Sequence, residues 1–329
     1  MTQFAQQLVN GVVIGALYGL IALGYTMVYG IIQLINFAHG EVFMVGAFGG
    51  LFVWTRVIPD GTPAGIALPL VLLGAILTSV TVALIMERFA YRPLRNAPRL
   101  APLITAIGVS LFLQELVRLY YPRCSAADTV GESIPRCGVT QGREYGALTD
   151  QQFPSLISGP NIKVGGVQIP RVSIFVVVVA ILLMVALSAF VRRSRTGKAM
   201  QATAQDRDTA KLMGINTDRI IVVAFVLGAA LAGVAGVMQG LQVGTVGFKM
   251  GFLAGIKAFT AAVLGGIGNI AGAVLGGFLL GIVEVMATQY APHPFSGGAW
   301  RDVWAFVVLI VLLVFRPSGL LGERVVSRS

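Results

Sequence analysis

The chain has 329 residues, of which 56% are hydrophobic and only 12% are charged, and its formal net charge is +10. Because an ordinary soluble domain carries about 25% charged residues, this composition excludes a soluble globular protein. In a soluble protein the positive charge would favour nucleic acid as a partner, but no aromatic platform or basic helix supports one here, so none is expected.

Apolar runs of about 20 residues recur along the chain, long enough to cross roughly 30 Å of hydrocarbon. Lipid offers the backbone no hydrogen-bond partners, so such runs must form helices. The expected spans cover residues about 7–29, 36–56, 65–87, 101–120, 171–191, 219–241 and 300–316. They predict an all-α fold: a polytopic transmembrane helical bundle of about 8 helices, some broken or partial, in a single domain over 1–329.

The stretch "QLINFAHGE" at 33–41 interrupts the first hydrophobic block with polar residues. Asn36, His39 and Glu41 are close enough in sequence to serve one broken helix end. A charged side chain in an apolar segment costs about 3 kcal/mol on insertion scales, so it usually has a role or a partner. Two readings stay open: these residues line or gate a solute path, or they satisfy backbone groups freed at the break or contact a partner subunit.

The distribution of basic residues predicts which loops face the cytoplasm. Fourteen of the 24 basic residues fall in segments 88–99, 192–219 and 316–329, which the positive-inside rule places in the cytoplasm. The span 101–120 then leaves the cytoplasm and 171–191 returns, so 121–170 is predicted to be an extracytoplasmic loop.

Both cysteines of the chain, Cys124 and Cys137, lie in this loop. An oxidising compartment would allow a disulfide between them, and two unpaired thiols are the alternative. The spacing of the two residues does not decide between these states.

The loop 192–218 contains "RTGKAMQATAQDRDTAKLMGINTDR" (195–219), a charged stretch between two apolar runs. Its composition predicts one helix of about 17 residues from Gly197 to Met213, with Thr196 as N-cap and Gly214 as C-cap. This helix is longer than a connection needs. Its small apolar face lacks a Trp, Phe or Ile anchor, which favours docking into a groove of another protein over lying on lipid headgroups.

The region 252–290 is rich in glycine and is punctuated by "GGIGN" at 265–269. It predicts a short or partial helix, a turn, and a longer helix from about Ile270 to Tyr290. Lys257 and Glu284 are its intramembrane charges and are further candidates for the pathway. The alternatives are that Lys257 snorkels to an interface and that Glu284 satisfies freed backbone groups or contacts a partner subunit. Two interrupted segments in one chain are typical of a transport pathway built from broken helices.

Glycines recur at intervals of four, which lets helix backbones approach closely in lipid. The tracks are Gly11, Gly15 and Gly19; Gly236, Gly240 and Gly244; and Gly247, Gly251 and Gly255. Tight packing explains them, and sliding of one helix against another during gating is the alternative. His39 and His293 are far apart and lack companions of metal-ligand type, so no metal site is expected.

Several stretches together resemble a known family. They are "TGKAMQATAQDRDTAKLMGINTDRI" (196–220), "YGLIALGYTMVYGIIQLINFAHGEVFMVGAF" (18–48), "ERFAYRPLR" (87–95), "LITAIGVSLFLQE" (103–115), "MGFLAGIKAFTAAVLGGIGNIAGAVLGG" (250–277) and "RPSGLLG" (316–322). The chain is similar to permease subunits of bacterial ATP-binding-cassette importers, in the branch for branched-chain amino acids and nearest to its H-type subunit. The loop 121–170 shows no such resemblance.

The resemblance implies a multi-pass protein of the bacterial inner membrane that is not itself an enzyme. Its partners would be a second homologous permease, two ATP-binding subunits and a periplasmic amino-acid-binding protein. The chain has no G-x-x-x-x-G-K-[ST] loop, so no cofactor is expected on it, and ATP and Mg²⁺ would bind to the partner ATPase subunits. Coupling to the ATPase is assigned by resemblance to Gly197, Ala202, Ala204, Asp206, Arg207, Ala210, Leu212 and Gly214.

Other functions are weighed against this one. Importers of urea and short amides share much of the pattern, so they are an alternative within the same class. An ion-coupled secondary transporter would need paired intramembrane acids and no docking helix, whereas only isolated acids are found. A membrane enzyme or channel would need clustered nucleophilic, histidine or metal-binding residues, and none cluster.

Overall fold

The computed structural model describes residues 2–33, 36–59, 61–94, 97–98, 100–121, 147, 150–157, 159–316 and 319–322. Helices account for most of them, which confirms the all-α prediction. The α-helices are α1 (Thr2–Ile32), α2 (His39–Phe52), α3 (Ala64–Met86), α4 (Leu100–Tyr120), α5 (Arg171–Arg193), α6 (Arg195–Gln205), α7 (Arg207–Leu212), α8 (Thr217–Val243), α9 (Met250–Gly265), α10 (Ile270–Tyr290) and α11 (Arg301–Phe315).

Short elements of other kinds extend or connect these helices. Two π-helical turns, Val53–Val57 and Glu87–Tyr91, prolong α2 and α3, and a 3₁₀ turn at Gly298–Trp300 precedes α11. Strands β2 (Ile162–Val164) and β3 (Val167–Ile169) form an antiparallel hairpin. Strands β1 (Gln151–Gln152) and β4 (Thr245–Val246) form a second antiparallel pair.

Seven helices of the described chain are long and apolar enough to cross a membrane. They are Thr2–Ile32, Ala64–Tyr91, Leu100–Tyr120, Arg171–Arg193, Thr217–Val243, Ile270–Tyr290 and Gly298–Phe315. The expected span 36–56 is not among them, because the polar residues before His39 delay the helix and α2 has only 14 residues. The apolar helix α9 is also short, with 16 residues. A polytopic bundle with partial helices, as predicted from the sequence, is therefore confirmed.

The backbone contacts divide the chain into two compact units. Unit 1 comprises Met1–Ile35, Gly159–Gly228 and Ile256–Ser329, and unit 2 comprises Asn36–Ser158 and Ala229–Gly255. Helices α8 and α9 each contribute residues to both units. The single permease domain and the membrane sides of the two loops stay predictions.

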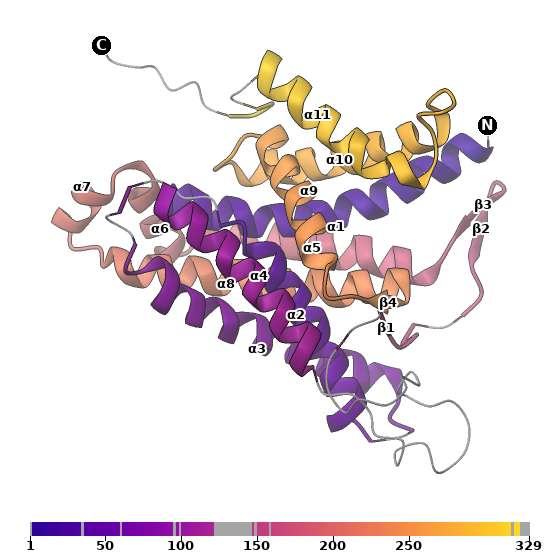
Figure 1. The fold of residues 1–329 in the computed structure, drawn as a ribbon, viewed down its shortest axis with the longest axis horizontal. Coiled ribbons are helices and arrows are strands. Elements are labelled where there is room, and N and C mark those ends of the chain that lie inside the picture. Colours follow the sequence, from indigo (N-terminus) through magenta and orange to yellow (C-terminus); the bar gives the residue numbers. More distant parts are fainter. Residues whose placement is uncertain are drawn as a thin grey trace. The chain divides into compact units, whose positions relative to one another are not determined.

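In unit 1, α1 packs lengthwise on α10 (Figure 1). A Cβ atom added at Gly11 would lie 2.8 Å from Cα of Ile282, and one at Gly15 would lie 2.7 Å from Cα of Phe278. Only glycine allows this separation, and Gly277 and Gly281 of α10 approach α1 in the same way. The first glycine track is therefore a packing surface, as expected from its spacing.

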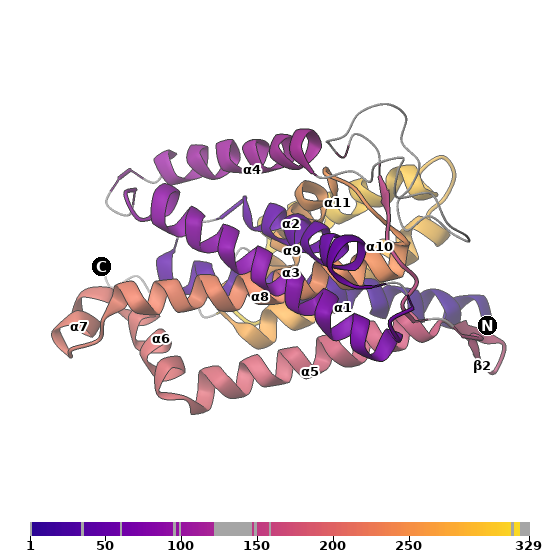
Figure 2. The same ribbon diagram turned by 90° about the horizontal axis from the view of Figure 1, so that it is seen from below.

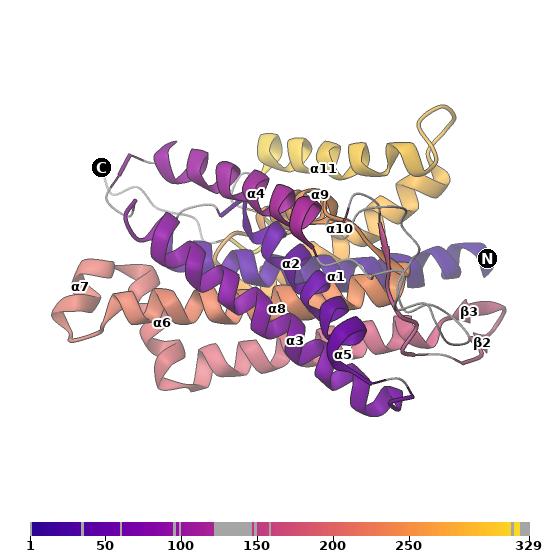
Figure 3. The ribbon, with the colours of Figure 1, turned by 60° about the horizontal axis from the view of Figure 1, so that its bottom comes forward.

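In unit 2, α2 packs on α3 and also contacts α4 (Figure 3). The α2 glycine Gly46 faces Gly233, whose Cα would be 2.5 Å from an added Cβ. Ser79 of α3 donates a hydrogen bond to the carbonyl of Val42 at 3.0 Å. Close backbone approach and a polar link thus hold these helices together, as is usual for helices in lipid.

The other two glycine tracks are only partly helical, which corrects the prediction. Gly244 lies just beyond α8 with φ +81°, and Gly247 precedes α9. Gly236 and Gly240 pack in α8, and Gly251 packs in the first turn of α9. The four-residue spacing of the glycines continues from a helix into a turn, because glycine is favoured both at helix crossings and at positive φ.

Both predicted interruptions are confirmed. Helix α1 ends at Ile32, Gln33 has φ 58°, and α2 begins at His39. Between α9 and α10, Gly266 and Gly268 have φ 104° and 92°. The α10 helix then begins at Ile270, as the sequence predicted.

Residues 319–322 cover the end of α9 in unit 1. The backbone N–H groups of Leu320 and Leu321 donate to the carbonyls of Leu264 and Gly265 at 2.9 and 3.0 Å. These carbonyls lie in the last turn of α9, where a helix leaves acceptors unpaired. Leu320 and Leu321, in the last part of the "RPSGLLG" stretch, thus cap α9.

The beginning of α1 lies beside the β2–β3 hairpin, also within unit 1 (Figure 1). The side-chain amide of Gln6 donates to the carbonyl of Gln168 at 2.9 Å and accepts from its backbone N–H at 2.8 Å. The hairpin belongs to the loop 121–170, so the N-terminal end of α1 lies on the same side as that loop. Cys124 and Cys137, the candidate disulfide, lie outside the described residues.

Candidate translocation and coupling sites

The predicted coupling segment is two helices, α6 and α7, and the prediction of one helix over 197–213 is wrong. Asp206 lies between them in an extended conformation, with φ −153° and ψ 112°. Its Oδ1 accepts from the backbone N–H groups of Asp208 and Thr209 at 2.9 and 3.1 Å. Asp side chains compete in this way with the helical hydrogen-bond ladder, and here the carboxylate caps a new helix.

The hydroxyl of Thr209 also donates to Oδ2 of Asp206 at 2.5 Å. This hydrogen bond, followed by the two from backbone N–H groups, holds the pKa of the exposed Asp206 below its ordinary value. Hydrogen bonds to a carboxylate favour the ionised form. Asp206 therefore acts on the shape of the loop in its charged state.

The predicted N-cap, Thr196, is also wrong by two residues. Ser194 caps α6, and its Oγ accepts from the backbone N–H of Gly197 at 2.9 Å. A Cβ atom at Gly197 would lie 2.5 Å from Cα of Val191 in α5. The absent side chain lets α6 fold back sharply on the end of α5 (Figure 2).

Gly214 ends α7 as predicted. It has φ +82°, its N–H donates to the carbonyl of Lys211 at 3.0 Å, and that of Ile215 donates to Ala210 at 3.1 Å. This pair of bonds is the Schellman arrangement, which needs a left-handed residue at the glycine position. A Cβ at Gly214 would meet nothing within 4 Å, so its role is conformational.

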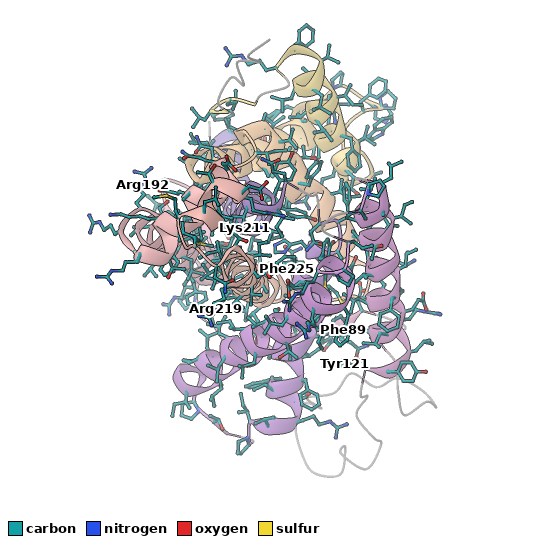
Figure 4. The ribbon with its side chains drawn as sticks, turned by 90° about the vertical axis from the view of Figure 1, so that its left-hand side faces the viewer. Phe89, Tyr121, Arg192, Lys211, Arg219 and Phe225 are labelled. Atoms are coloured by element: carbon teal, nitrogen blue, oxygen red, sulfur yellow. The ribbon has the colours of Figure 1, made fainter. Side chains whose placement is uncertain are left out.

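The residues assigned to coupling differ in exposure. Gly197 and Ala210 are buried, Ala202, Ala204 and Arg207 are half-buried, and Asp206, Leu212 and Gly214 are exposed. Leu212 is 87% exposed, and Met213, which the sequence did not single out as a site residue, is 78% exposed. Two adjacent apolar side chains at the end of a polar loop form a small contact surface. Figure 4 looks at this end of unit 1, where Arg192, Lys211 and Arg219 are labelled.

In unit 1 the structure brings Lys257 and Glu284 together. Nζ of Lys257 lies 3.0 Å from Oε1 of Glu284, and both side chains are buried. The same oxygen accepts from the hydroxyl of Tyr18 at 3.1 Å and pairs with Nε of Arg301. Lys257 also pairs with Asp302 at 2.5 Å. This ion network (Tyr18, Lys257, Glu284, Arg301 and Asp302) joins α1, α9, α10 and α11.

Sequence reasoning missed Tyr18, Arg301 and Asp302. The available signal was the Arg–Asp pair at the start of the last apolar run, which could have been matched in charge to Lys257 and Glu284. Buried charges are normally paired, so a search for complementary charges near span ends would have found the network.

In unit 2, Asn36, His39 and Glu41 are all buried at the start of α2. Asn36 accepts a hydrogen bond from the hydroxyl of Tyr91 at 2.6 Å. Oε1 of Glu41 accepts from Ser110 at 3.0 Å and from Gln114 at 2.8 Å. Among the described residues, Oε2 of Glu41 has no hydrogen-bond partner.

The five candidates for the pathway thus fall into two groups. Asn36, His39 and Glu41 belong to unit 2, and Lys257 and Glu284 belong to unit 1. Their role in lining a pathway stays a prediction. The described residues contain no cluster of three or more His, Cys, Asp or Glu side chains that could hold a metal ion.

Seven apolar spans, two interrupted segments and a structured polar loop define a multi-pass helical membrane protein of transporter type. Residues 7–315 match the family described as "Branched-chain amino acid transport system / permease component". The chain belongs to this family, and it is therefore a multi-pass protein of the inner membrane.

Three relatives illustrate the family. The chain is 44% identical over 329 residues to the high-affinity branched-chain amino acid transport system permease protein BraD of Pseudomonas aeruginosa, covering 99% of this chain and 98% of BraD. It is 42% identical over 331 residues to the corresponding protein LivH of Escherichia coli strain K12, covering 99% and 97%. A probable branched-chain amino acid transport permease of Methanocaldococcus jannaschii is 29% identical over 308 residues, covering 92% and 88%.

Proposed function

We propose that this chain is a permease subunit of an ATP-binding-cassette importer that translocates leucine, isoleucine and valine. The observation that carries the proposal is the relationship to BraD and LivH over 99% of the chain, at 44% and 42% identity. Both relatives are named for branched-chain amino acids rather than for urea or short amides. The substrate class assigned here follows theirs.

The proposal includes separate subunits that hydrolyse ATP, with ATP and Mg²⁺ bound there and no cofactor on this chain. A second permease would pair with this one, and a soluble binding protein would deliver the amino acid. Helices α6 and α7 would form the contact with the ATPase. Two features of this loop support the proposal. The absent side chain of Gly197 lets α6 pack closely on α5, and Leu212 and Met213 at the end of α7 are exposed to solvent.

The division of the loop suggests how force would pass through it. An ATPase that binds Leu212 and Met213 would move α7, and the capped turn at Asp206 would carry this motion to α6. Because α6 packs against α5 and α1, the motion would reach the membrane helices of unit 1. An amino acid needs only transient contacts in such a path, which backbone groups at broken helices can provide.

Transport by the reconstituted importer tests the substrate class. The chain, co-expressed with its genetic neighbours and placed in proteoliposomes, is expected to take up leucine when ATP is supplied inside and the binding protein outside. Urea and acetamide serve as the competing solutes. Stimulation of ATP hydrolysis by urea or acetamide and not by leucine would contradict the proposed substrate.

Docking is tested separately with Leu212→Ser and Met213→Ser in one chain. Co-purification of the ATPase is expected to fall by at least tenfold, because hot-spot side chains each cost about 2 kcal/mol or more when removed. Gln201→Ser on α6, also exposed, is the matched control and should retain the ATPase. Full retention by the double variant would place the ATPase contact elsewhere.

A further inference from the structure

The junction of α5 and α6 carries four basic side chains within seven residues. Arg192 and Arg193 end α5, and Arg195 and Lys198 lie in the first turn of α6. All four are exposed. No acidic side chain of the described chain forms an ion pair with any of them.

Helix α5 has one face packed in unit 1 and one apolar face exposed along its length. Its inner face includes Met184, whose Cε would lie 2.9 Å from a Cβ at Gly19 of α1. The outer face is apolar and 37–62% exposed, and it comprises Ile174, Val178, Ile181, Leu182 and Val185. A face of this composition on a membrane span is suited to contact with acyl chains.

The two arginines of α5 continue this outer face. Arg192 follows Val185 by seven residues and Arg193 follows Leu182 by eleven, and both steps return to nearly the same side of an α-helix. From Ile174 to Arg192 the helix rises by about 27 Å, close to the roughly 30 Å thickness of the hydrocarbon. A lipid whose tail lies on α5 therefore has its headgroup at the level of Arg192 and Arg193.

The start of α6 adds to the positive potential at this level. Arg195 and Lys198 are three residues apart and so lie on one face of α6. The first turn of α6 contains no acidic residue, although a helix N-terminus favours negative charge. Two cations at that position are unfavourable for the helix unless an anion lies beside them.

We infer that the α5–α6 junction, defined by Arg192, Arg193, Arg195 and Lys198, binds the headgroup of an anionic phospholipid whose acyl chain lies on the outer face of α5. Four cations directly beyond a membrane helix form a typical anionic-lipid surface. A phospholipid contacts both the apolar outer face of α5 and the cations Arg192 and Arg193 at its end. An acidic protein would contact only the cations, so the arrangement favours a lipid. This inference does not depend on the transported substrate.

Native mass spectrometry of the purified full chain tests the inference. Phosphatidylglycerol and phosphatidylcholine, added in equal amounts, are the probes. Phosphatidylglycerol is expected to be retained preferentially, and Arg192→Gln with Arg193→Gln should weaken its binding about 25-fold. This value takes about 1 kcal/mol, or about fivefold, for each cation near the headgroup. Arg195→Gln with Lys198→Gln should give a loss of similar size.

The matched control is Lys163→Gln with Lys249→Gln, which removes the same charge from exposed positions that are not part of the junction sequence. It should leave the preference for phosphatidylglycerol unchanged, and an equal loss would show that only net charge matters. Competition by inorganic phosphate as effective as that by phosphatidylglycerol would show a soluble anion site. Unchanged lipid retention in both junction variants would show that these four cations do not hold the lipid. The inference would be overturned by an equal loss in the control, by equally effective competition from inorganic phosphate, or by unchanged lipid retention in the junction variants.

Discussion

Two glutamates of the described chain are fully buried, and their surroundings differ in charge. Glu284 in unit 1 and Glu41 in unit 2 are both 0% exposed, and each has one carboxylate oxygen without a hydrogen-bond partner among the described residues. The bonded oxygen of Glu284 meets two cations, Lys257 and Arg301, whereas that of Glu41 meets only the neutral donors Ser110 and Gln114.

The difference shows that burial of an acid in a membrane helix does not by itself define its role. The charges of Lys257, Glu284, Arg301 and Asp302 sum to zero, so their network can hold helices together without an unbalanced charge in lipid. Among the described residues, the hydrogen-bond partners of Glu41 include no cation. The network therefore gives Glu284 a packing role between α9, α10 and α11 that Glu41 lacks, while the pathway role predicted for both acids stays a prediction.

Removing Glu284, the buried acid of the ion network, should have the largest effect. Glu284→Ala leaves the buried Lys257 with only Asp302 as a partner and removes the acceptor of the half-buried Arg301. Breaking a buried ion pair costs about 3–5 kcal/mol. The thermal unfolding midpoint of the purified chain in detergent is expected to fall strongly. An unchanged midpoint would show that the network does not stabilise unit 1.

The network also predicts a compensating pair of substitutions. Lys257→Met with Glu284→Gln removes one charge of each sign, and well-packed neutral replacements of buried ion pairs are often tolerated. The double variant should be more stable than Glu284→Ala. If the double variant is instead less stable than Glu284→Ala, the ion pair stabilises the fold by more than balancing its two buried charges.

Crowding the free oxygen of Glu41 should have an intermediate effect. In Gly251→Ala, the new Cβ would lie 2.5 Å from Oε2 of Glu41 and 2.6 Å from the carbonyl oxygen of Gly40. Overpacking of this kind costs about 1–3 kcal/mol. Gly108→Ala is the control, because a Cβ at Gly108 meets nothing within 4 Å. Equal stability of the two variants in the same thermal assay would contradict this packing around Glu41.

Neutralising Glu41 should cost less still. Glu41→Gln retains an acceptor for Ser110 and Gln114, so the unfolding midpoint should change by the equivalent of less than about 1 kcal/mol. Leucine uptake by the reconstituted importer supplies the second readout. Loss of uptake with the midpoint preserved would support a pathway role. A loss of stability as large as in Glu284→Ala would show that both acids serve structure alike.

The contrast also marks what a sequence can predict. Six of the seven expected spans, the two interruptions and the cap at Gly214 depend on local composition and glycine placement, and they were predictable. The partners of Glu284 lie on three other helices, so no local pattern contains them. Asp206 illustrates a third limit: its neighbours favour helix, yet its own side chain caps the next helix and divides the segment in two.

Asp206, an exposed acid, extends the comparison to pH and should show the smallest effect. Its pKa is held below the ordinary value by the hydroxyl and the N–H of Thr209 and the N–H of Asp208. A folded-state pKa below that of the unfolded state means that the stabilisation is complete above the unfolded value. It is lost as pH falls through the folded value. Amide hydrogen exchange in α7 should therefore become faster relative to α6 at acidic pH, after correction for the intrinsic rate.

Asp206→Asn retains a capping oxygen but has no charge to titrate, so it should show little pH dependence. If the exchange in wild type and in Asp206→Asn responds identically to acid, the ionised carboxylate does not stabilise this turn. Any motion passed from α7 to α6 would then depend on the backbone alone.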